Sequence, residues 1–455
     1  MGNSKKIKIK NKNISIIGMG ETGQGAALLA KKLGANVLIS DSNKITEKMF
    51  NQKARNMGIE VETGGHTNKI YNSDLWILSP GIPSNINIIK NAIDQGIKIV
   101  SEIEFASWFT SKPIVGVTGS NGKTTTVNII NSILIESNLE PILAGNMGFA
   151  FSRAISNDLF ECDKNRVYIL ELSSFQLENI ASFKPFISIL LNITPDHQDR
   201  YSSMEKYLKA KMKISMNQDK DCHLLYNSDD KMLVKNCKNL NAKKTTFGLE
   251  NNDQNIIKSD GFSIYNDQKK LISTDTIILK GRHNLSNILA AATAAKILNV
   301  NDESIANALS KVSGIEHRLE KVSTIDGVTY YNDSKATNIE SVIAAIESFT
   351  EPIILILGGE DKNSNFNLLM PFIGNNIKKI VSYGKARNKI SIALRDAVEL
   401  NKVFSLRDAV EECKKSAASG DIILLSPGCA SFDQFKNYEH RGNEFKKIVN
   451  DAVYA

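Results

Sequence analysis

The feature that most constrains the fold is a recurring pattern in which a short apolar run ends in turn residues and a helix-like segment follows. The clearest runs are ISIIG (14–18), NVLISD (36–41), LWILSPG (75–81), PIVGVTG (113–119), VYILELSS (167–174), ISILLNIT (187–194), PIILILGG (352–359), IKKIVSYG (377–384) and DIILLSPG (421–428). Continuous β-branched runs of this length are typical of strands buried on both faces of a parallel sheet. Helix-like segments such as 125–136 and 284–297 lie between them, so the chain is predicted to be an α/β protein.

A length of 455 residues predicts more than one domain. Two glycine-rich turns and a fresh set of strands after residue 315 divide the chain into three predicted domains. These are a Rossmann-like domain over 1–110, a central P-loop ATPase-like parallel-sheet domain over 111–314, and a C-terminal Rossmann-like domain over 315–455. The stretch 240–280 is polar and strand-like, and we expect it to be an antiparallel excursion.

Composition argues against several classes of protein. The 56 Lys and Arg residues exceed the 49 Asp and Glu residues by seven, and they are spread along the chain, which disfavours nucleic-acid binding. No apolar run is long enough for a spanning helix, and the lysine-rich first dozen residues lack the apolar core of a signal peptide. Five scattered cysteines without CxxC pairs favour a reducing cytoplasm.

The first glycine-rich turn is Gly18-Met19-Gly20-Glu21-Thr22-Gly23, directly after a predicted strand, and Asp41 ends the next strand. Such glycines let a diphosphate approach a helix N-terminus, and the acid can meet a ribose hydroxyl. NAD(P), another nucleotide diphosphate and a purely structural turn all remain open on this motif.

The second glycine-rich turn runs from Gly116 to Thr124 and reads GVTGSNGKT. Val117 stands where the strict P-loop pattern has glycine, but a strand still feeds a loop that ends in Gly-Lys-Thr and opens a helix. Backbone N–H groups of such a loop cradle phosphates, Lys123 can reach the β- and γ-oxygens, and Thr124 can hold Mg²⁺. The motif predicts ATP use.

Further polar groups follow other predicted strands. Glu171 ends VYILE, and Asp196 with His197 follows ISILLNIT, so these groups are expected at the same sheet edge as the phosphate loop, as a hard-cation site. On its pattern alone, Lys211 belongs to a solvated helix face.

Three clusters in the last third also follow strands, over 331–338, 358–362 and 426–435. Their cationic and hydroxyl groups suit a small anionic substrate. Cys429 has no evident base partner, so it is not expected to act as a nucleophile.

Taken together, several motifs resemble the Mur ligases. They are GVTGSNGKTT (116–125), GNMG (145–148), ELSSFQLE (171–178), NITPDHQDRY (192–201), KAKMKI (209–214), GRHNLSN (281–287), EHRLE (316–320), NDSKATN (332–338), GGEDKN (358–363) and PGCASFDQFKNYEHRGNEF (427–445). They cover nearly the whole chain from about residue 13, in order. The blocks SSFQLE, DHQDRY and PGCASFDQF resemble the D-glutamate-adding branch more than its sisters or folylpolyglutamate synthase.

The resemblance assigns roles by motif position. It implies that the first domain holds a UDP-sugar diphosphate rather than NAD(P), through Gly18, Gly20, Thr22, Gly23, Asp41, Ser42, Ser79 and Gly81, with Asn146 and Ser173 toward the reacting end. It implies ATP contacts from Gly119, Ser120, Asn121, Gly122, Lys123, Thr124, Thr125, Asn284, Asn287, Arg318 and Asp333. It implies D-glutamate contacts from Lys335, Thr337, Lys362, Ser431 and Phe432.

The resemblance also implies the reactive centre. Its catalytic residues would be Lys123, Asn146, Glu171, His197 and Lys211, with two Mg²⁺ sites formed by Thr124, Glu171, His197 and a carbamylated Lys211. The implied reaction is ATP-dependent addition of D-glutamate to UDP-N-acetylmuramoyl-L-alanine through an acyl phosphate, in cytoplasmic peptidoglycan precursor synthesis. A monomer whose C-terminal domain closes over ATP is expected. An NAD(P) oxidoreductase and a P-loop motor or switch remain as alternatives from other classes.

Overall fold

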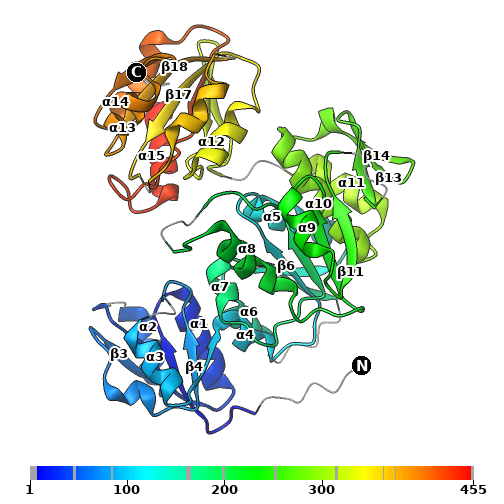
Figure 1. The fold of residues 1–455 in the computed structure, drawn as a ribbon, viewed down its shortest axis with the longest axis vertical. Helices are drawn as coiled ribbons and strands as arrows, with labels where there is room; N and C mark the ends of the chain where they lie inside the picture. Colours follow the sequence, from blue (N-terminus) through cyan, green and yellow to red (C-terminus); the bar gives the residue numbers. More distant parts are fainter. Residues whose placement is uncertain are drawn as a thin grey trace. The chain divides into compact units, whose positions relative to one another are not determined.

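The fold is described from a computed structural model of the chain (Figure 1). The structure describes residues 8–44, 48–83, 86–159, 165–196, 200–250, 254–312, 316–361, 363–374 and 376–451. It divides into two compact units, one of Met1–Thr274 with Asn287–Leu309 and one of Asp275–Ser286 with Ser310–Ala455. Each unit is described by itself.

The first unit begins with a five-stranded parallel sheet in the order β3-β2-β1-β4-β5. Its strands are β1 (Asn13–Ile17), β2 (Asn36–Asp41), β3 (Glu60–Thr63), β4 (Leu75–Leu78) and β5 (Lys98–Ser101), and its helices are α1 (Glu21–Lys32), α2 (Lys48–Asn56), η1 (Asn68–Tyr71), α3 (Asn87–Asp94) and α4 (Glu102–Ser107). Alternate strand residues enter opposite cores: Ile77 packs with α1 and α4, whereas Trp76 packs with η1 and α3. Burial on both faces explains the continuous apolar runs, and the Rossmann-like prediction is confirmed.

The same unit contains a second parallel sheet, in the order β11-β10-β9-β6-β8-β7. Its strands are β6 (Ile114–Thr118), β7 (Glu140–Gly145), β8 (Arg166–Glu171), β9 (Ile187–Leu190), β10 (His223–Asn227) and β11 (Lys243–Phe247). Its helices are α5 (Lys123–Glu136), α6 (Phe151–Asp158), α7 (Ser174–Glu178), α8 (Met204–Met212), η2 (Lys213–Ser215) and α9 (Lys231–Cys237). One continuous apolar core joins this sheet to the first through α1, α4 and α6.

The stretch 240–280 is only partly the antiparallel excursion that we predict from its polarity. β11 pairs in parallel with β10 as the edge strand of the second sheet, where a polar outer face is tolerated. The antiparallel part is a separate three-stranded sheet of β12 (Ile257–Ser259), β13 (Ser263–Asn266) and β14 (Lys269–Ser273), followed by η3 (Thr274–Thr276), α10 (Arg282–Ile297) and α11 (Asp302–Lys311).

The second unit is built on a six-stranded sheet in the order β15-β16-β20-β17-β18-β19, in which only the β15–β16 pair is antiparallel. Its elements are β15 (Glu320–Ile325), β16 (Val328–Asn332), α12 (Ile339–Ile346), β17 (Ile353–Gly358), η4 (Phe366–Phe372), β18 (Ile377–Tyr383), α13 (Arg387–Leu394), β19 (Glu399–Lys402), α14 (Leu406–Ser416), β20 (Ile422–Leu425) and α15 (Tyr438–Asp451). Along β17, Leu355 faces the core formed with α12 and α13, and Ile356 faces the core formed with α14 and α15. Helices therefore cover both faces, as in a Rossmann-like domain.

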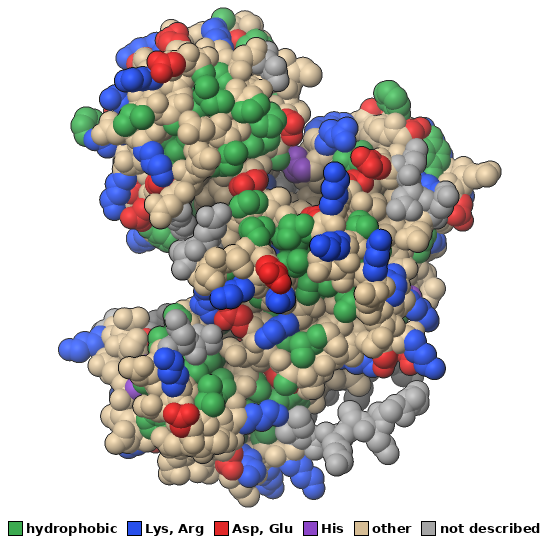
Figure 2. Space-filling model, viewed as in Figure 1, with side chains coloured by type: hydrophobic (Ala, Val, Ile, Leu, Met, Phe, Trp, Pro, Cys, Tyr) green, Lys and Arg blue, Asp and Glu red, His purple; other side chains and the backbone are tan. Residues whose placement is uncertain are grey.

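Charged side chains of both signs are spread over the face drawn in Figure 2. Lys and Arg side chains (blue) are dispersed there, with Asp and Glu side chains (red) between them. Across the described parts of the chain, no helix combines the length and apolar character needed to cross a membrane.

Candidate active site

The glycine-rich loop 116–124 joins β6 to α5, as the sequence predicts. Gly122 caps α5 with a φ of +86°, and a Cβ at this position would lie 2.4 Å from the Asn287 Oδ1 atom. The left-handed backbone conformation favours glycine here, and a larger residue would also displace the Asn287 side chain. The loop opens onto the N-terminus of a 14-residue helix, which is the arrangement that binds phosphate groups.

Lys123 lies over this loop. Its Nζ atom donates hydrogen bonds to the carbonyl oxygens of Gly119 and Ser120, each at 2.7 Å. The ammonium group is therefore held beside the same backbone that would cradle a triphosphate.

Asn192, which follows β9, supports the loop from the neighbouring strand. The Asn121 N–H donates to Asn192 Oδ1 at 2.8 Å, and the Asn192 amide returns a bond to the Asn121 carbonyl at 3.1 Å. Asn192 was not among the residues predicted for the site, although its place two residues after a buried strand was the available signal.

Glu171 is the centre of the polar cluster at the end of β8. It is 3% exposed, its Oε2 atom accepts a bond of 2.8 Å from the Thr124 hydroxyl, and its Oε1 atom accepts one of 2.9 Å from the Asn146 amide. Thr124 and Glu171 thus meet at one sheet edge, as the sequence predicts, and Asn146 joins them there. A hydroxyl and a carboxylate beside a phosphate loop are donors that suit a hard cation.

Lys211 is 1% exposed, so the expectation of a solvated lysine on α8 is wrong. Its Nζ atom donates to the Gly119 carbonyl at 2.8 Å and lies 4.5 Å from the centre of the Tyr207 ring. Burial, followed by the nearby charge of Lys123, lowers the pKa of Lys211 well below its usual value. A buried amine with a lowered pKa is one that can react as a neutral nucleophile.

His197 and Lys362 lie outside the described residues, so their predicted roles stay predictions. In the part of the chain that is described, no group of three or more His, Cys, Asp and Glu side chains could hold a metal ion. The Thr124–Glu171 pair supplies two of the predicted ligands.

The first glycine-rich turn joins β1 to α1. A Cβ at Gly23 would lie 1.9 Å from the Gly18 carbonyl oxygen, so the turn cannot close around a larger residue there. Gly18 has a φ of +98°, and its carbonyl accepts a bond of 3.2 Å from the Ser79 hydroxyl. The Asp41 carboxylate accepts from the Met19 N–H at 2.8 Å, which ties the turn to the end of β2. The other predicted members of this set are wholly or partly exposed: Gly20, Thr22, Ser42 and Gly81.

Ser173 has a local structural partner. Its hydroxyl accepts from the Gln176 N–H, and the Gln176 side chain accepts from the Ser173 N–H, which forms a capping box at the start of α7. The box fixes α7 immediately after Glu171.

Of the predicted ATP residues, Asn284, Arg318 and Asp333 belong to the second unit, and Asp333 makes the most polar contacts of the three. Its Oδ2 atom accepts a bond of 2.8 Å from the Ser426 hydroxyl and its Oδ1 atom accepts one of 3.3 Å from the Leu319 N–H. Burial raises the pKa of Asp333 to about 7. The buried Arg318 Nε atom has no hydrogen-bond partner, and a buried donor of this kind fits an anionic ligand.

Asn284, in the same unit, is 6% exposed and donates to the Lys280 carbonyl at 2.7 Å.

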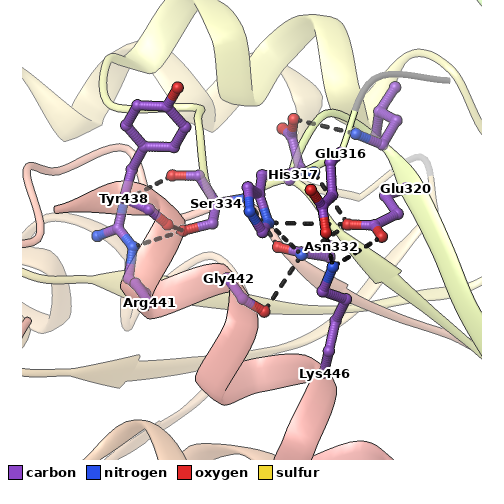
Figure 3. Close-up of polar contacts among 11 residues, drawn as sticks. Glu316, His317, Glu320, Asn332, Ser334, Tyr438, Arg441, Gly442 and Lys446 are labelled. Carbon is purple, nitrogen blue, oxygen red and sulfur yellow. Dashed lines mark hydrogen bonds and ion pairs between the residues drawn. The ribbon is translucent and has the colours of Figure 1, made fainter.

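Arg441, which the sequence analysis missed, organises the loops of the second unit (Figure 3). It extends from α15, is fully buried, and donates to the Ser334 hydroxyl at 2.9 Å, the Ser334 carbonyl at 2.7 Å and the Cys429 carbonyl at 3.1 Å. One guanidinium therefore ties loop 332–338 to loop 427–435. Burial raises the pKa of the Cys429 thiol to about 12, in keeping with the expectation that it is not a nucleophile.

The predicted D-glutamate residues lie in these two loops. Lys335 Nζ is 5.1 Å from the Tyr438 ring, Ser431 is 2% exposed and Phe432 is 64% exposed. Thr337 is partly buried one residue before Asn338, whose side chain caps α12.

Three family models match the chain. They are described as Mur ligase MurD-like, N-terminal domain, over residues 12–101; Mur ligase middle domain, over 117–295; and Mur ligase, glutamate ligase domain, over 317–429.

Curated relatives match along almost the whole length. The UDP-N-acetylmuramoylalanine--D-glutamate ligase of Christiangramia forsetii is 39% identical, covering 97% of this chain and 99% of the relative. The protein of the same name from Staphylococcus epidermidis is 37% identical, covering 96% of each chain.

Solved structures share the fold at low sequence identity. A pseudomurein peptide ligase type C from Methanothermus fervidus superposes with a TM-score of 0.62 at 19% identity, over 97% of this chain and 100% of that one. The MurF ligase from Thermotoga maritima in complex with ADP superposes with a TM-score of 0.61 at 16% identity, over 98% and 97%.

Proposed function

The chain belongs to the Mur ligase family, and from this premise we propose that it uses ATP to add D-glutamate to UDP-N-acetylmuramoyl-L-alanine. The near-full-length match to relatives that carry this activity in their name supports the choice of substrates. The observation that carries the chemistry is the Thr124–Glu171 pair at the phosphate loop, with the buried amine of Lys211 beside the same loop.

The proposed reaction has two steps. The alanine carboxylate attacks the γ-phosphorus of ATP, so that an acyl phosphate forms and the bond to ADP breaks. The D-glutamate amine then attacks the acyl carbon, and the tetrahedral intermediate loses phosphate while the nitrogen loses a proton, which leaves an amide. Lys123 and the N–H groups of the loop offset the negative charge that develops during phosphoryl transfer.

We assign Mg²⁺ to Thr124 and Glu171, together with His197 and a modified Lys211. The hydroxyl and carboxylate oxygens that meet at 2.8 Å are the donor types that Mg²⁺ prefers, so the described residues fit the ion. When bound, Mg²⁺ would neutralise phosphate charge.

We also propose that Lys211 is carbamylated by CO₂. Its burial and lowered pKa favour the neutral amine that such a reaction needs. The carbamate would replace a cation with an anion next to the phosphate loop, as a site with two cations requires.

The two substrates that are joined would be held by different domains. We place the uridine diphosphate at the turn of Gly18–Gly23 with Asp41 and Ser79, and D-glutamate at loops 332–338 and 427–435 with Lys362. The enzyme would act as a cytoplasmic monomer in peptidoglycan precursor synthesis, with domain boundaries near residues 110 and 314.

Release of phosphate from ATP tests the proposal. Release should require UDP-N-acetylmuramoyl-L-alanine and D-glutamate together, L-glutamate should not replace D-glutamate, and the product should contain one new amide. Phosphate release that does not respond to the UDP-substrate would favour a P-loop switch, and reduction of NAD(P) would favour an oxidoreductase.

A further inference from the structure

Arg200 links α7 to the turn of residues 79–82, which follows β4. Its Nε and Nη2 atoms bind both carboxylate oxygens of Glu178 on α7, at 3.2 and 2.7 Å. The side chains of this pair are only 18% and 16% exposed. Such a two-point pair fixes the plane of the guanidinium as well as its position.

The remaining N–H groups of the same guanidinium, on Nη1 and Nη2, face the turn that follows β4. Nη1 donates to the Pro80 carbonyl and Nη2 donates to the Ile82 carbonyl, each through a long bond of 3.4 Å. Arg200 thus makes contacts with α7 and with the turn that follows β4. The five N–H donors of arginine can serve both, whereas the three donors of a lysine ammonium cannot adopt this planar arrangement.

Aromatic packing holds the guanidinium in place. Its central carbon lies 4.3 Å from the centre of the Phe175 ring, on α7. Phe175 stacks on Tyr201 at 5.9 Å, and the Tyr201 hydroxyl donates to Glu178 at 2.7 Å. The orientation of Arg200 is therefore set by its neighbours before any ligand binds.

The two elements that Arg200 contacts, the turn of residues 79–82 and α7, each lie next to a part of the proposed active site. The turn packs on Gly18: a Cβ there would lie 2.7 Å from Ser79 Oγ and 3.3 Å from Ile82 Cδ1. On the other side, α7 begins three residues after Glu171 and is fixed there by its capping box. Between the turn and α7 lies a cavity of ≈ 10 Å³, which has room for about one water molecule.

We propose that Arg200 is a positioning residue that locks the turn 79–82 onto α7 and so fixes the span between the UDP-binding turn and Glu171. This inference rests on the proposed function, because it takes the turn as part of the UDP-substrate site. When the uridine diphosphate is bound at Gly18, this fixed span positions the other end of the substrate, the reacting alanine carboxylate, beside Glu171.

The test compares Arg200→Lys with Arg166→Lys. Arg166 is a matched control, because it is also mostly buried and paired with carboxylates, but it lies at the opposite end of β8 from Glu171. Binding of UDP-N-acetylmuramoyl-L-alanine is measured by calorimetry without ATP, and KM and kcat are measured for each substrate.

For Arg200→Lys we expect the KM for the UDP-substrate to rise about tenfold and its binding to weaken by a similar factor, because the contact between the turn and α7 is lost. The KM for ATP should stay within about twofold of the wild type, because the phosphate loop is unchanged. Glu178→Gln should show the same pattern, and Arg166→Lys should leave all these constants unchanged.

Two results would overturn the inference: unchanged binding of the UDP-substrate by Arg200→Lys, or a lower melting temperature with no change in KM, which would mean that Arg200 serves stability alone. Failure of the proposed function is a separate outcome, because the wild-type protein would then form no product from the UDP-substrate.

Discussion

The Thr124 hydroxyl donates a hydrogen bond of 2.8 Å to the Glu171 carboxylate, and this bond joins the first turn of α5 to the end of β8. The two residues are far apart in sequence, but β6 and β8 are neighbours in the sheet, so their carboxyl ends open at the same edge. Two oxygen donors are thereby presented to the phosphate loop from different strands.

Thr124→Val should lower kcat by about 100-fold, because it keeps the shape of the side chain and removes one oxygen from the proposed cation site. Thr124→Ser should keep most of the activity. Phosphate release measured over a range of Mg²⁺ concentrations checks this, and the valine variant should require more Mg²⁺ for half-maximal rate. Equal rates for the two variants would remove Thr124 from the ion site.

Lys211→Met should abolish most of the turnover, because it removes the only atom at this buried position that can take up CO₂. Lys209→Met is the control on the same helix, since Lys209 is 74% exposed and should tolerate the change. Enzyme prepared without CO₂ should regain activity on addition of bicarbonate. A wild-type enzyme that is indifferent to bicarbonate would contradict the carbamate assignment.

The architecture could be predicted because a strand that is buried on both faces of its sheet is apolar along its whole length, and such a run is visible in the sequence. β17, with Leu355 and Ile356 in different cores, is apolar throughout, and the run was recognisable for that reason. β11 left a weaker mark, because an edge strand carries polar residues such as Lys243 and Lys244. Local polarity could not reveal whether it pairs in parallel or antiparallel fashion.

The site could be predicted only where a chemically functional side chain lies at or just after the end of a predicted strand. Thr124 and Glu171 follow strands and meet as expected, but the burial of Lys211 depends on how α8 packs against the phosphate loop, which no local pattern records. Arg441 and Arg200 were missed for the same reason: each acts on backbone carbonyls that are distant in sequence.

Glu102 makes stability depend on pH. Burial, which is only partly offset by the bond from the Ser152 N–H, raises the pKa of Glu102 to about 7, and its Oε2 atom has no hydrogen-bond partner. The folded state therefore holds an extra proton between about pH 4 and 7, so the contribution of this group to stability falls as pH rises, by up to about 3 kcal/mol. Glu102→Gln should raise the melting temperature at pH 8 and have little effect at pH 5. The exposed Asp396→Asn should show no such difference between the two pH values; an equal effect of Glu102→Gln at both would show that its ionisation is not the cause.

Glu104 should have the opposite dependence. Burial alone would raise the pKa of this carboxylate, but bonds from the Ser182 hydroxyl, the N–H groups of Ala181 and Ser182 and the Trp108 indole hold it below the usual value. Its stabilisation is therefore complete above the unfolded pKa of about 4.3 and is lost as pH falls through the lower folded value. Glu104→Gln replaces one acceptor with a donor, and should reduce the free energy of unfolding by about 2 kcal/mol at pH 7 and by less in acid.

Denaturant unfolding from pH 3 to 7 measures this loss of stability, with the exposed Glu205→Gln as control. A loss that stays constant down to pH 3 would mean that shape, and not charge, makes Glu104 important.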